Sequence, residues 1–223
     1  MSLKAKLATT IAALCMVICL LSVGVWAATT ATVTLKGTVN FVAKDVSVTV
    51  SGVAKGTTPA TTQDGQPTER PISTLAAATW SADKEPAEAV VWNDGEEESG
   101  IDLTFDNKNE VITVVITVAN NNTQRHVDVA FAPTLTFEST EVPLTSTETL
   151  IKGANLYAKY ERTDTNEQID KATVTEGETP VVTPTTATYT ITLRIADKNN
   201  AVNSVVLDGT MTISDPSEAK TEG

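Results

Sequence analysis

Apolar and polar residues alternate along much of this chain, which is the pattern of β-strands that bury one face. The clearest case begins at Ile101, where every second residue through Phe105 is apolar. Residues 106–109 then suit a turn, and residues 111–118 are rich in β-branched side chains. With a third alternating run at 127–131, these segments predict an antiparallel meander with one apolar face.

The same alternation predicts further strands on both sides of this meander. They cover residues 33–41, 46–50, 156–162, 189–195 and 205–213. The first two are close enough in sequence to form a hairpin, and the apolar faces of the last two should meet. About eight to ten strands joined by polar turns predict an all-β fold, a two-sheet antiparallel β-sandwich of the jelly-roll or Ig-like kind.

The alternating pattern also predicts the members of one hydrophobic core. They are Leu103, Phe105, Val129, Phe131, Ile191 and Leu193.

Two stretches between the predicted strands lack an apolar period. Residues 52–71 consist largely of Thr, Pro, Gly, Gln and charged residues, which predicts a flexible loop. Residues 176–186 indicate a second loop rich in Pro and Thr, and residues 75–80 suit either a short helix or a strand. We therefore expect one domain over residues 28–214.

The first 27 residues have the pattern of a secretory signal peptide. Lys4 and Lys6 precede an apolar run without charge, and Val25 and Ala27 fit the −3 and −1 positions of a signal-peptidase site. Residues 1–27 are thus predicted to form a hydrophobic signal helix, cut after Ala27, and the protein to be secreted, extracellular or at the cell surface. An uncleaved membrane anchor remains the alternative, since a membrane span needs about 20 apolar residues.

Cysteine content and charge narrow the class of protein. Both cysteines, Cys15 and Cys19, lie in the signal segment, so the exported chain has no thiol for a disulfide, a zinc site or a nucleophile. This favours a bacterial exported protein. The net charge of −12 repels nucleic acid and anionic lipid, so we expect no nucleic-acid partner, and membrane contact only through an uncleaved signal. Residues 215–223 are predicted to be a polar tail.

No catalytic signature is present in the sequence. His126 is the single histidine and is expected on the outward face of a strand, and no Gly-x-Ser-x-Gly motif supplies a nucleophilic serine. Residues 96–98 are three glutamates after a predicted turn, which indicates a solvated loop rather than an acid and base pair for glycoside hydrolysis. The sequence predicts a protein that is not an enzyme and binds no cofactor, with a secreted hydrolase as the least favoured alternative.

Four oxygen-rich turns are weak candidates for calcium sites. They contain Asp94, Asp106, Asp164 and Asp197. None has the ligand spacing of an EF-hand loop. A structural calcium is therefore a candidate that composition alone suggests.

Trp80 and Trp92 are the two tryptophans of the exported chain. An exposed pair could stack on sugar rings, which makes an extracellular carbohydrate-binding module the principal alternative function. Aromatic residues make up only 4% of the chain, so a sandwich core would use them, and we expect both in the core.

Several segments together resemble the TasA/camelysin family of bacterial biofilm-matrix fibre proteins. They are the hydrophobic export signal, the Thr/Val strand immediately after it, residues 101–105 and 118–121, and the closing strand 209–213. The resemblance covers most of the exported chain in outline. It implies a jelly-roll-like sandwich that polymerises by donating its N-terminal strand to the next subunit.

Residues 32–41 are therefore open to two interpretations. They form either the first strand of their own domain or a strand donated to a neighbouring copy, because unpaired backbone at a sheet edge can accept a strand from another chain. From the sequence we expect a secreted, non-enzymatic structural or adhesive subunit of a bacterial cell surface or biofilm matrix. Its expected partners are further copies of itself or cell-surface and matrix proteins.

Overall fold

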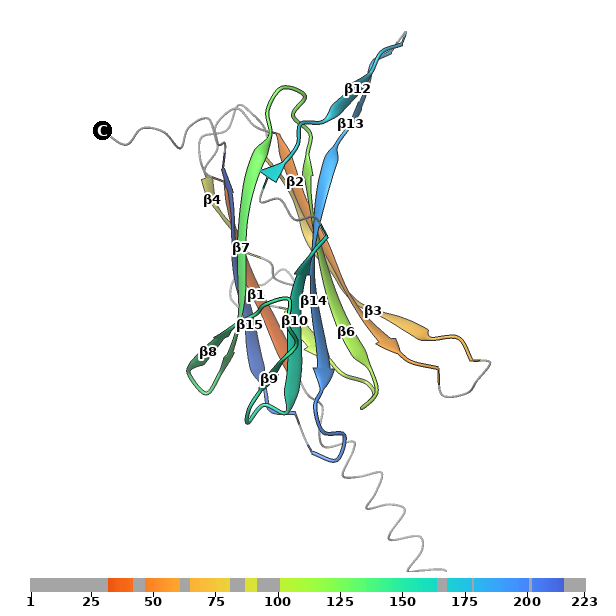
Figure 1. The fold of residues 1–223 in the computed structure, drawn as a ribbon, viewed down its shortest axis with the longest axis vertical. Helices are drawn as coiled ribbons and strands as arrows, with labels where there is room; N and C mark the ends of the chain where they lie inside the picture. Colours follow the sequence, from red (N-terminus) through yellow and green to blue (C-terminus); the bar gives the residue numbers. More distant parts are fainter. Residues whose placement is uncertain are drawn as a thin grey trace, which may run out of the picture.

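A computed structural model gives the fold of most of the chain between residues 32 and 214. It describes residues 32–41, 47–60, 65–80, 87–91, 101–163, 168–177, 179–200 and 202–214. Within these ranges every regular element is a β-strand, and the strands build two large sheets that face each other (Figure 1). The predicted all-β fold is confirmed. The predicted signal helix and polar tail lie outside the described residues.

The first sheet, sheet A, is built around three long strands. β7 (Val127–Phe137), β15 (Val205–Ser214) and β1 (Thr32–Phe41) lie side by side in that order. Short strands extend both edges: β4 (Ala87–Val91) and β5 (Ile101–Thr104) pair with β1, and β8 (Thr140–Pro143) and β11 (Gln168–Ile169) pair with β7. β1 and β15 run parallel, whereas the other described pairs of this sheet are antiparallel.

The second sheet, sheet B, is antiparallel throughout its described pairs. Its strands lie in the order β3 (Thr68–Trp80), β2 (Val48–Thr58), β6 (Val111–Asn120), β14 (Thr185–Ile195), β10 (Leu156–Arg162) and β9 (Thr149–Ile151). A separate pair, β12 (Thr173–Thr175) and β13 (Val181–Thr183), projects beyond the two sheets. We call the end of the sandwich that carries this pair the upper end.

The core lies between the sheets, and strict alternation of side chains produces it. In β6 every second residue, from Ile112 to Val118, is fully buried. The two predicted facing surfaces are also confirmed: the residues Tyr189, Ile191, Leu193 and Ile195 of sheet B and Val205, Leu207, Met211 and Ile213 of sheet A are all buried. Of the six predicted core residues, Phe131 is only partly buried, packed against the rim of the core, and the other five are buried.

Packing of this kind makes small core changes measurable. Ile116 is fully buried on β6, so Ile116→Val should lower the free energy of unfolding by about 0.5 to 1.5 kcal/mol. Val53→Thr, at a valine that is 39% exposed on β2, should change it by about 0.5 kcal/mol or less. Urea denaturation of the two variants checks the difference, and equal effects would show that the inward faces are misassigned.

The predicted meander is wrong in its sheet assignment. β5 belongs to sheet A, β6 to sheet B and β7 to sheet A, so the chain crosses the sandwich at each turn. The predicted hairpin of 33–41 and 46–50 is wrong for the same reason, because β1 and β2 lie in different sheets. Alternation reports which face of a strand is buried and does not report which strand pairs with it.

The predicted flexible loop at 52–71 is largely wrong. β2 continues to Thr58 and β3 begins at Thr68, and the two strands pair over most of this stretch. The inward residues here are Ala54 and Gly56, whose small side chains give no apolar signal. The β2–β3 pairing also shifts register twice, and such bulges break the alternation that reveals a strand. Residues 75–80 belong to β3, and residues 181–183 and 185–186, placed in the second predicted loop, are strand residues.

Candidate functional site: the slot that the first strand fills

β1 fills a slot in the middle of sheet A. On one side it pairs in parallel with β15, from Val33 opposite Val205 to Phe41 opposite Ile213. On the other side it pairs antiparallel with β5 over residues 32–35 and with β4 over residues 38–41. Backbone pairing on both edges holds the strand. Without β1, β15 and the β4/β5 edge would face each other across a gap one strand wide.

The inward side chains of β1 complete the core of the sandwich. Val33, Leu35 and Val39 are 0%, 2% and 0% exposed. The intervening residue Thr34 points to the other face, where its hydroxyl donates to Asp102 Oδ1 on β5 at 2.9 Å. Because these three buried residues share one parity, a shift of the strand by one residue would turn them out of the core, and the register in the slot is strongly specified.

The strands that flank β1 are not its neighbours along the chain. β15 is the last described strand of the chain. β4 and β5 are separated from β1 in sequence by β2 and β3, which belong to the other sheet. Residues 42–47 alone join β1 to the rest of the domain. A strand inserted in this way is held by pairing and burial, and an identical strand from another copy would make the same contacts.

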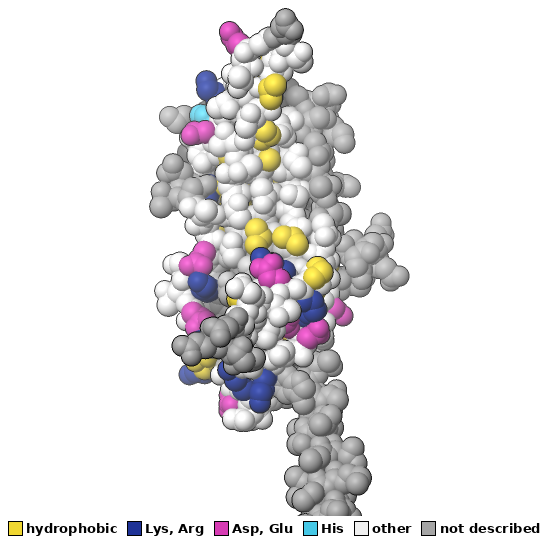
Figure 2. Space-filling view, turned by 90° about the vertical axis from the view of Figure 1, so that its right-hand side faces the viewer, with side chains coloured by type: hydrophobic (Ala, Val, Ile, Leu, Met, Phe, Trp, Pro, Cys, Tyr) yellow, Lys and Arg dark blue, Asp and Glu magenta, His cyan; other side chains and the backbone are white. Residues whose placement is uncertain are grey.

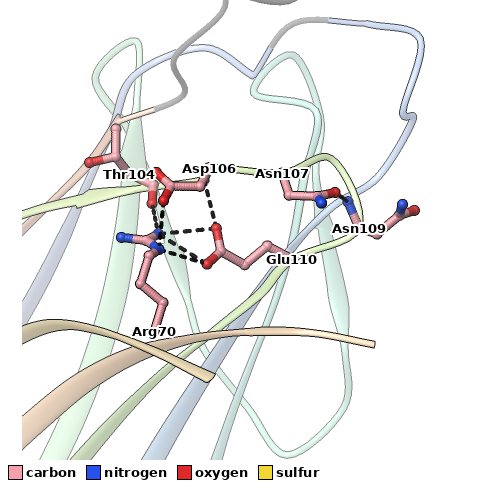
Figure 3. Close-up of polar contacts among 6 residues, drawn as sticks. All are labelled: Arg70, Thr104, Asp106, Asn107, Asn109 and Glu110. Carbon is pink, nitrogen blue, oxygen red and sulfur yellow. Dashed lines mark hydrogen bonds and ion pairs between the residues drawn. The ribbon is translucent and has the colours of Figure 1, made fainter. Parts of the chain in front are cut away.

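A polar clamp fixes the lower part of the slot (Figure 3). Arg70 on β3 reaches across the sandwich and donates from Nη2 to the carbonyl oxygen of Thr104, the last residue of β5, at 2.7 Å. Its guanidinium also donates to both carboxylate oxygens of Glu110 at 3.1 Å and pairs with Asp106 at 2.9 Å. Thr104 lies opposite Thr32 of β1, so the clamp positions the strand against which β1 begins.

Glu110 is the buried member of this clamp. Its side chain is 2% exposed, and its Oε2 also accepts a hydrogen bond from the backbone N–H of Asp106 at 2.7 Å. Room for the carboxylate comes from Gly56 on β2, where a Cβ would lie 1.8 Å from Glu110 Oε1. A buried carboxylate is tolerated when a cation and hydrogen bonds satisfy it, and Arg70, Asp106 and Gly56 provide those conditions together.

A buried asparagine organises the upper end. Asn120, 0% exposed at the end of β6, donates from Nδ2 to the carbonyl oxygens of Arg125 and Asp170 at 2.9 and 3.1 Å. The backbone N–H of Asn121 donates to the carbonyl oxygen of Ser47, just before β2, at 2.9 Å. The three asparagines that the sequence presents as a simple turn thus tie the start of β2 to the segment that leads into β12.

Two of the four calcium candidates lie in the described part of the chain. The carboxylate of Asp106 forms an ion pair with the guanidinium of Arg70. Asp197 closes its own turn: Oδ1 accepts from the backbone N–H of Asn199 at 2.9 Å and Oδ2 from Asn200 Nδ2 at 2.6 Å. Asp94 and Asp164 lie outside the described residues. Within those residues no three His, Cys, Asp or Glu side chains gather as a metal site.

The remaining candidate residues do not converge on one site. His126 is exposed immediately before β7. Trp80 ends β3, but its side chain lies outside the described part, as do Trp92 and residues 96–98. The slot and its clamp were not found from the sequence, because Arg70 and Glu110 are 40 residues apart and neither stands in a recognisable motif.

The outer face of sheet B carries its charges mainly in its lower half (Figure 2). There Arg194 donates to Glu148 through Nε at 2.6 Å and through Nη2, and its guanidinium lies 4.1 Å from the ring centroid of Tyr157. The hydrogen bond from Arg194 holds the pKa of Glu148 below its ordinary value. The small contribution of the Arg194–Glu148 ion pair to the free energy of unfolding is therefore present above pH 4.5 and is lost as the pH falls through the lowered pKa of Glu148.

Comparison with known proteins gives no relative for this chain. No protein-family model, no curated protein and no solved structure matches it. Within the described residues there is no helix long and apolar enough to span a membrane.

Proposed function

We propose that this chain is a secreted, non-enzymatic structural subunit of a bacterial cell surface or biofilm matrix, and that it polymerises by donating β1 to a neighbouring copy. The observation that supports this most is the position of β1 between β15 and the β4/β5 edge, with only residues 42–47 tying it to the domain. The TasA/camelysin resemblance of the sequence points in the same direction.

Strand exchange between copies is feasible because β1 of one copy can make the same contacts in the slot of another. A β1 strand from a second copy would pair with β15 and β5 in the same register and bury the same valines and leucine. The folded-back and donated states therefore make the same strand contacts and differ mainly in the path of the linker. Because donation joins two chains, a higher protein concentration favours the donated state. Exchange that does not close on itself produces an open polymer.

Within the sandwich class we assign the domain to the jelly-roll kind. Successive strands change sheet from β5 to β6, from β6 to β7 and from β14 to β15, as in a double-sheet jelly roll. The cleaved signal peptide and the extracellular location belong to the same proposal, since a matrix subunit must be exported.

A carbohydrate-binding module is less well supported. Three grooves in the described part of the chain include an aromatic side chain: Phe137, Tyr160 and Tyr157 each line one of them. The groove of Tyr157 is the one that also contains the amide side chains of Asn155 and Asn200. Arg194 covers one face of that ring, whereas sugar recognition needs an aromatic face open to the ligand. No contact in this groove favours sugar binding over the role of a structural subunit.

Assembly of the exported protein tests the proposal. A chain beginning at Ala28 should form particles whose size grows with concentration, seen by light scattering, and fibres in negative-stain images. A protein that stays monomeric at high concentration, with and without calcium, would contradict the proposed polymerisation.

The start of the exported protein can be checked separately. N-terminal sequencing of the secreted form should give Ala28, because Val25 and Ala27 satisfy the cleavage rule. Recovery of protein beginning at Met1 from the membrane fraction would instead indicate an anchored subunit.

A further inference from the structure

Every residue of the two strands of the β12–β13 hairpin is exposed. The hairpin forms a separate two-stranded sheet that extends beyond the upper end of the sandwich (Figure 1). Two strands alone are marginally stable in water. A projecting ribbon of this kind therefore gains stability from any surface that covers it.

The hairpin is also unusually apolar for an exposed element. Val174, Val181 and Val182 are 47%, 57% and 46% exposed, and they are three of the five exposed large hydrophobic side chains among the described residues. Val174 and Val182 are direct cross-strand partners and share one face, while Val181 pairs with Thr175 on the other. Both faces of the ribbon thus present valine to solvent.

The base of the hairpin is firmly attached. The backbone N–H of Ala172 donates to the carbonyl oxygen of Asn122 at 2.7 Å, and Ala172 is 3% exposed. On the returning side, Thr185 at the start of β14 donates from Oγ1 to the carbonyl oxygen of Lys171 at 2.9 Å. The asparagine cluster that anchors the start of β2 therefore also holds the hairpin in a defined direction.

The length of the β1–β2 linker determines where two strand-exchanged copies must meet. From residue 41 to residue 48 the chain can span at most about 25 Å, at 3.3–3.6 Å per residue. Val48 and Thr185 both pair with Asn120, so β2 begins beside the base of the hairpin. A copy that accepts β1 must therefore place its own upper end within about 25 Å of the donor's upper end.

We propose that the β12–β13 hairpin forms a second contact between neighbouring copies, in which its valines pack against the upper end of the adjacent subunit. This inference rests on the proposed strand donation and adds a surface to it. The occupant is a second copy, because the linker brings that surface within reach. β12 and β13 consist of Thr and Val alone. A second copy of this strongly acidic chain therefore meets no negative charge on these two strands that would repel it.

A charge placed on the hairpin tests this surface. Val182→Asp should raise the critical concentration for assembly about tenfold or more, as expected when a central apolar contact is lost, and should leave the melting temperature of the monomer unchanged. The matched control is Val53→Asp, at a valine 39% exposed on β2, which should assemble like the wild type. Light scattering across a concentration series measures both.

The outcomes separate this inference from the proposed function. Assembly of Val182→Asp at the wild-type concentration, or equal loss in Val53→Asp, would overturn the hairpin contact while strand donation stands. A wild-type chain that does not assemble would overturn both. If Val182→Asp melts earlier than the wild type, Val182→Thr, which keeps the shape of the side chain, replaces it and should still raise the critical concentration.

Discussion

Deleting residues 28–41 is expected to leave a protein that cannot hold its fold alone and that a peptide of the same residues restores. The deletion removes Val33, Leu35 and Val39 from the core and unpairs β15 and β5. Burial of such side chains is worth about 1.5 to 3 kcal/mol each, against a total stability of about 5 to 15 kcal/mol. Circular dichroism and size-exclusion chromatography, with and without the peptide, measure the rescue.

Peptide variants show whether binding in the slot depends on the side chains that the peptide buries. A peptide carrying Leu35→Ala should bind more weakly by about 2 to 5 kcal/mol, because Leu35 is 2% exposed in the slot. A peptide carrying Lys36→Ala, at an exposed position, should bind almost as the natural sequence does. A truncated protein that stays folded and monomeric and ignores the peptide would refute both interpretations of residues 32–41.

Arg70→Ala is expected to be the most damaging single substitution at the clamp. It leaves the Glu110 carboxylate, 2% exposed, without its counter-charge and the Thr104 carbonyl without its donor. Removing one partner of a buried ion pair costs about 3 to 5 kcal/mol, and because the Arg70 side chain is 31% exposed, we expect a loss near the lower end of this range. We expect the urea midpoint to fall accordingly and the amides of residues 32–35 to exchange faster, since β5 then no longer holds the start of β1.

An exposed ion pair between β2 and β3 provides the control. Lys55 pairs with Glu69 at 2.9 Å, with side chains 38% and 61% exposed. Lys55→Ala should therefore cost about 0 to 1 kcal/mol and leave exchange at residues 32–35 unchanged. Similar losses in Arg70→Ala and Lys55→Ala would show that Arg70 acts as an ordinary surface charge and does not position β5.

The sequence predicts strands and inward faces well where the buried side chains are large. Ile191 and Leu193, and Leu207 with Ile213 opposite them, alternate cleanly and are buried as predicted. The prediction fails where the buried residues are small, as at Ala54 and Gly56. There, hydropathy cannot distinguish a strand that packs its backbone against a carboxylate from a polar loop.

Strand partners and the clamp could not be predicted for a different reason. The slot of β1 joins the first strand to the last, and the clamp joins Arg70 to Glu110, 40 residues away. Such contacts depend on how the sheets stack, whereas a local pattern reports only the burial of each segment. One local signal did exist for the upper end: three successive asparagines after a strand indicate a turn, although not the hydrogen bonds that Asn120 makes.

The most direct test of strand donation is a disulfide that can form only between copies. Thr34 of β1 lies directly opposite Val206 of the adjacent strand β15. Neighbouring strands lie about 4.7–4.9 Å apart, a separation that a disulfide can bridge, and no cysteine follows residue 19. Chains carrying Thr34→Cys and chains carrying Val206→Cys would be mixed under assembling conditions and oxidised. Strand donation predicts a covalent dimer of one chain of each kind, at a yield that rises with assembly. A cross-link confined to the double variant Thr34→Cys/Val206→Cys, within single chains, would contradict it.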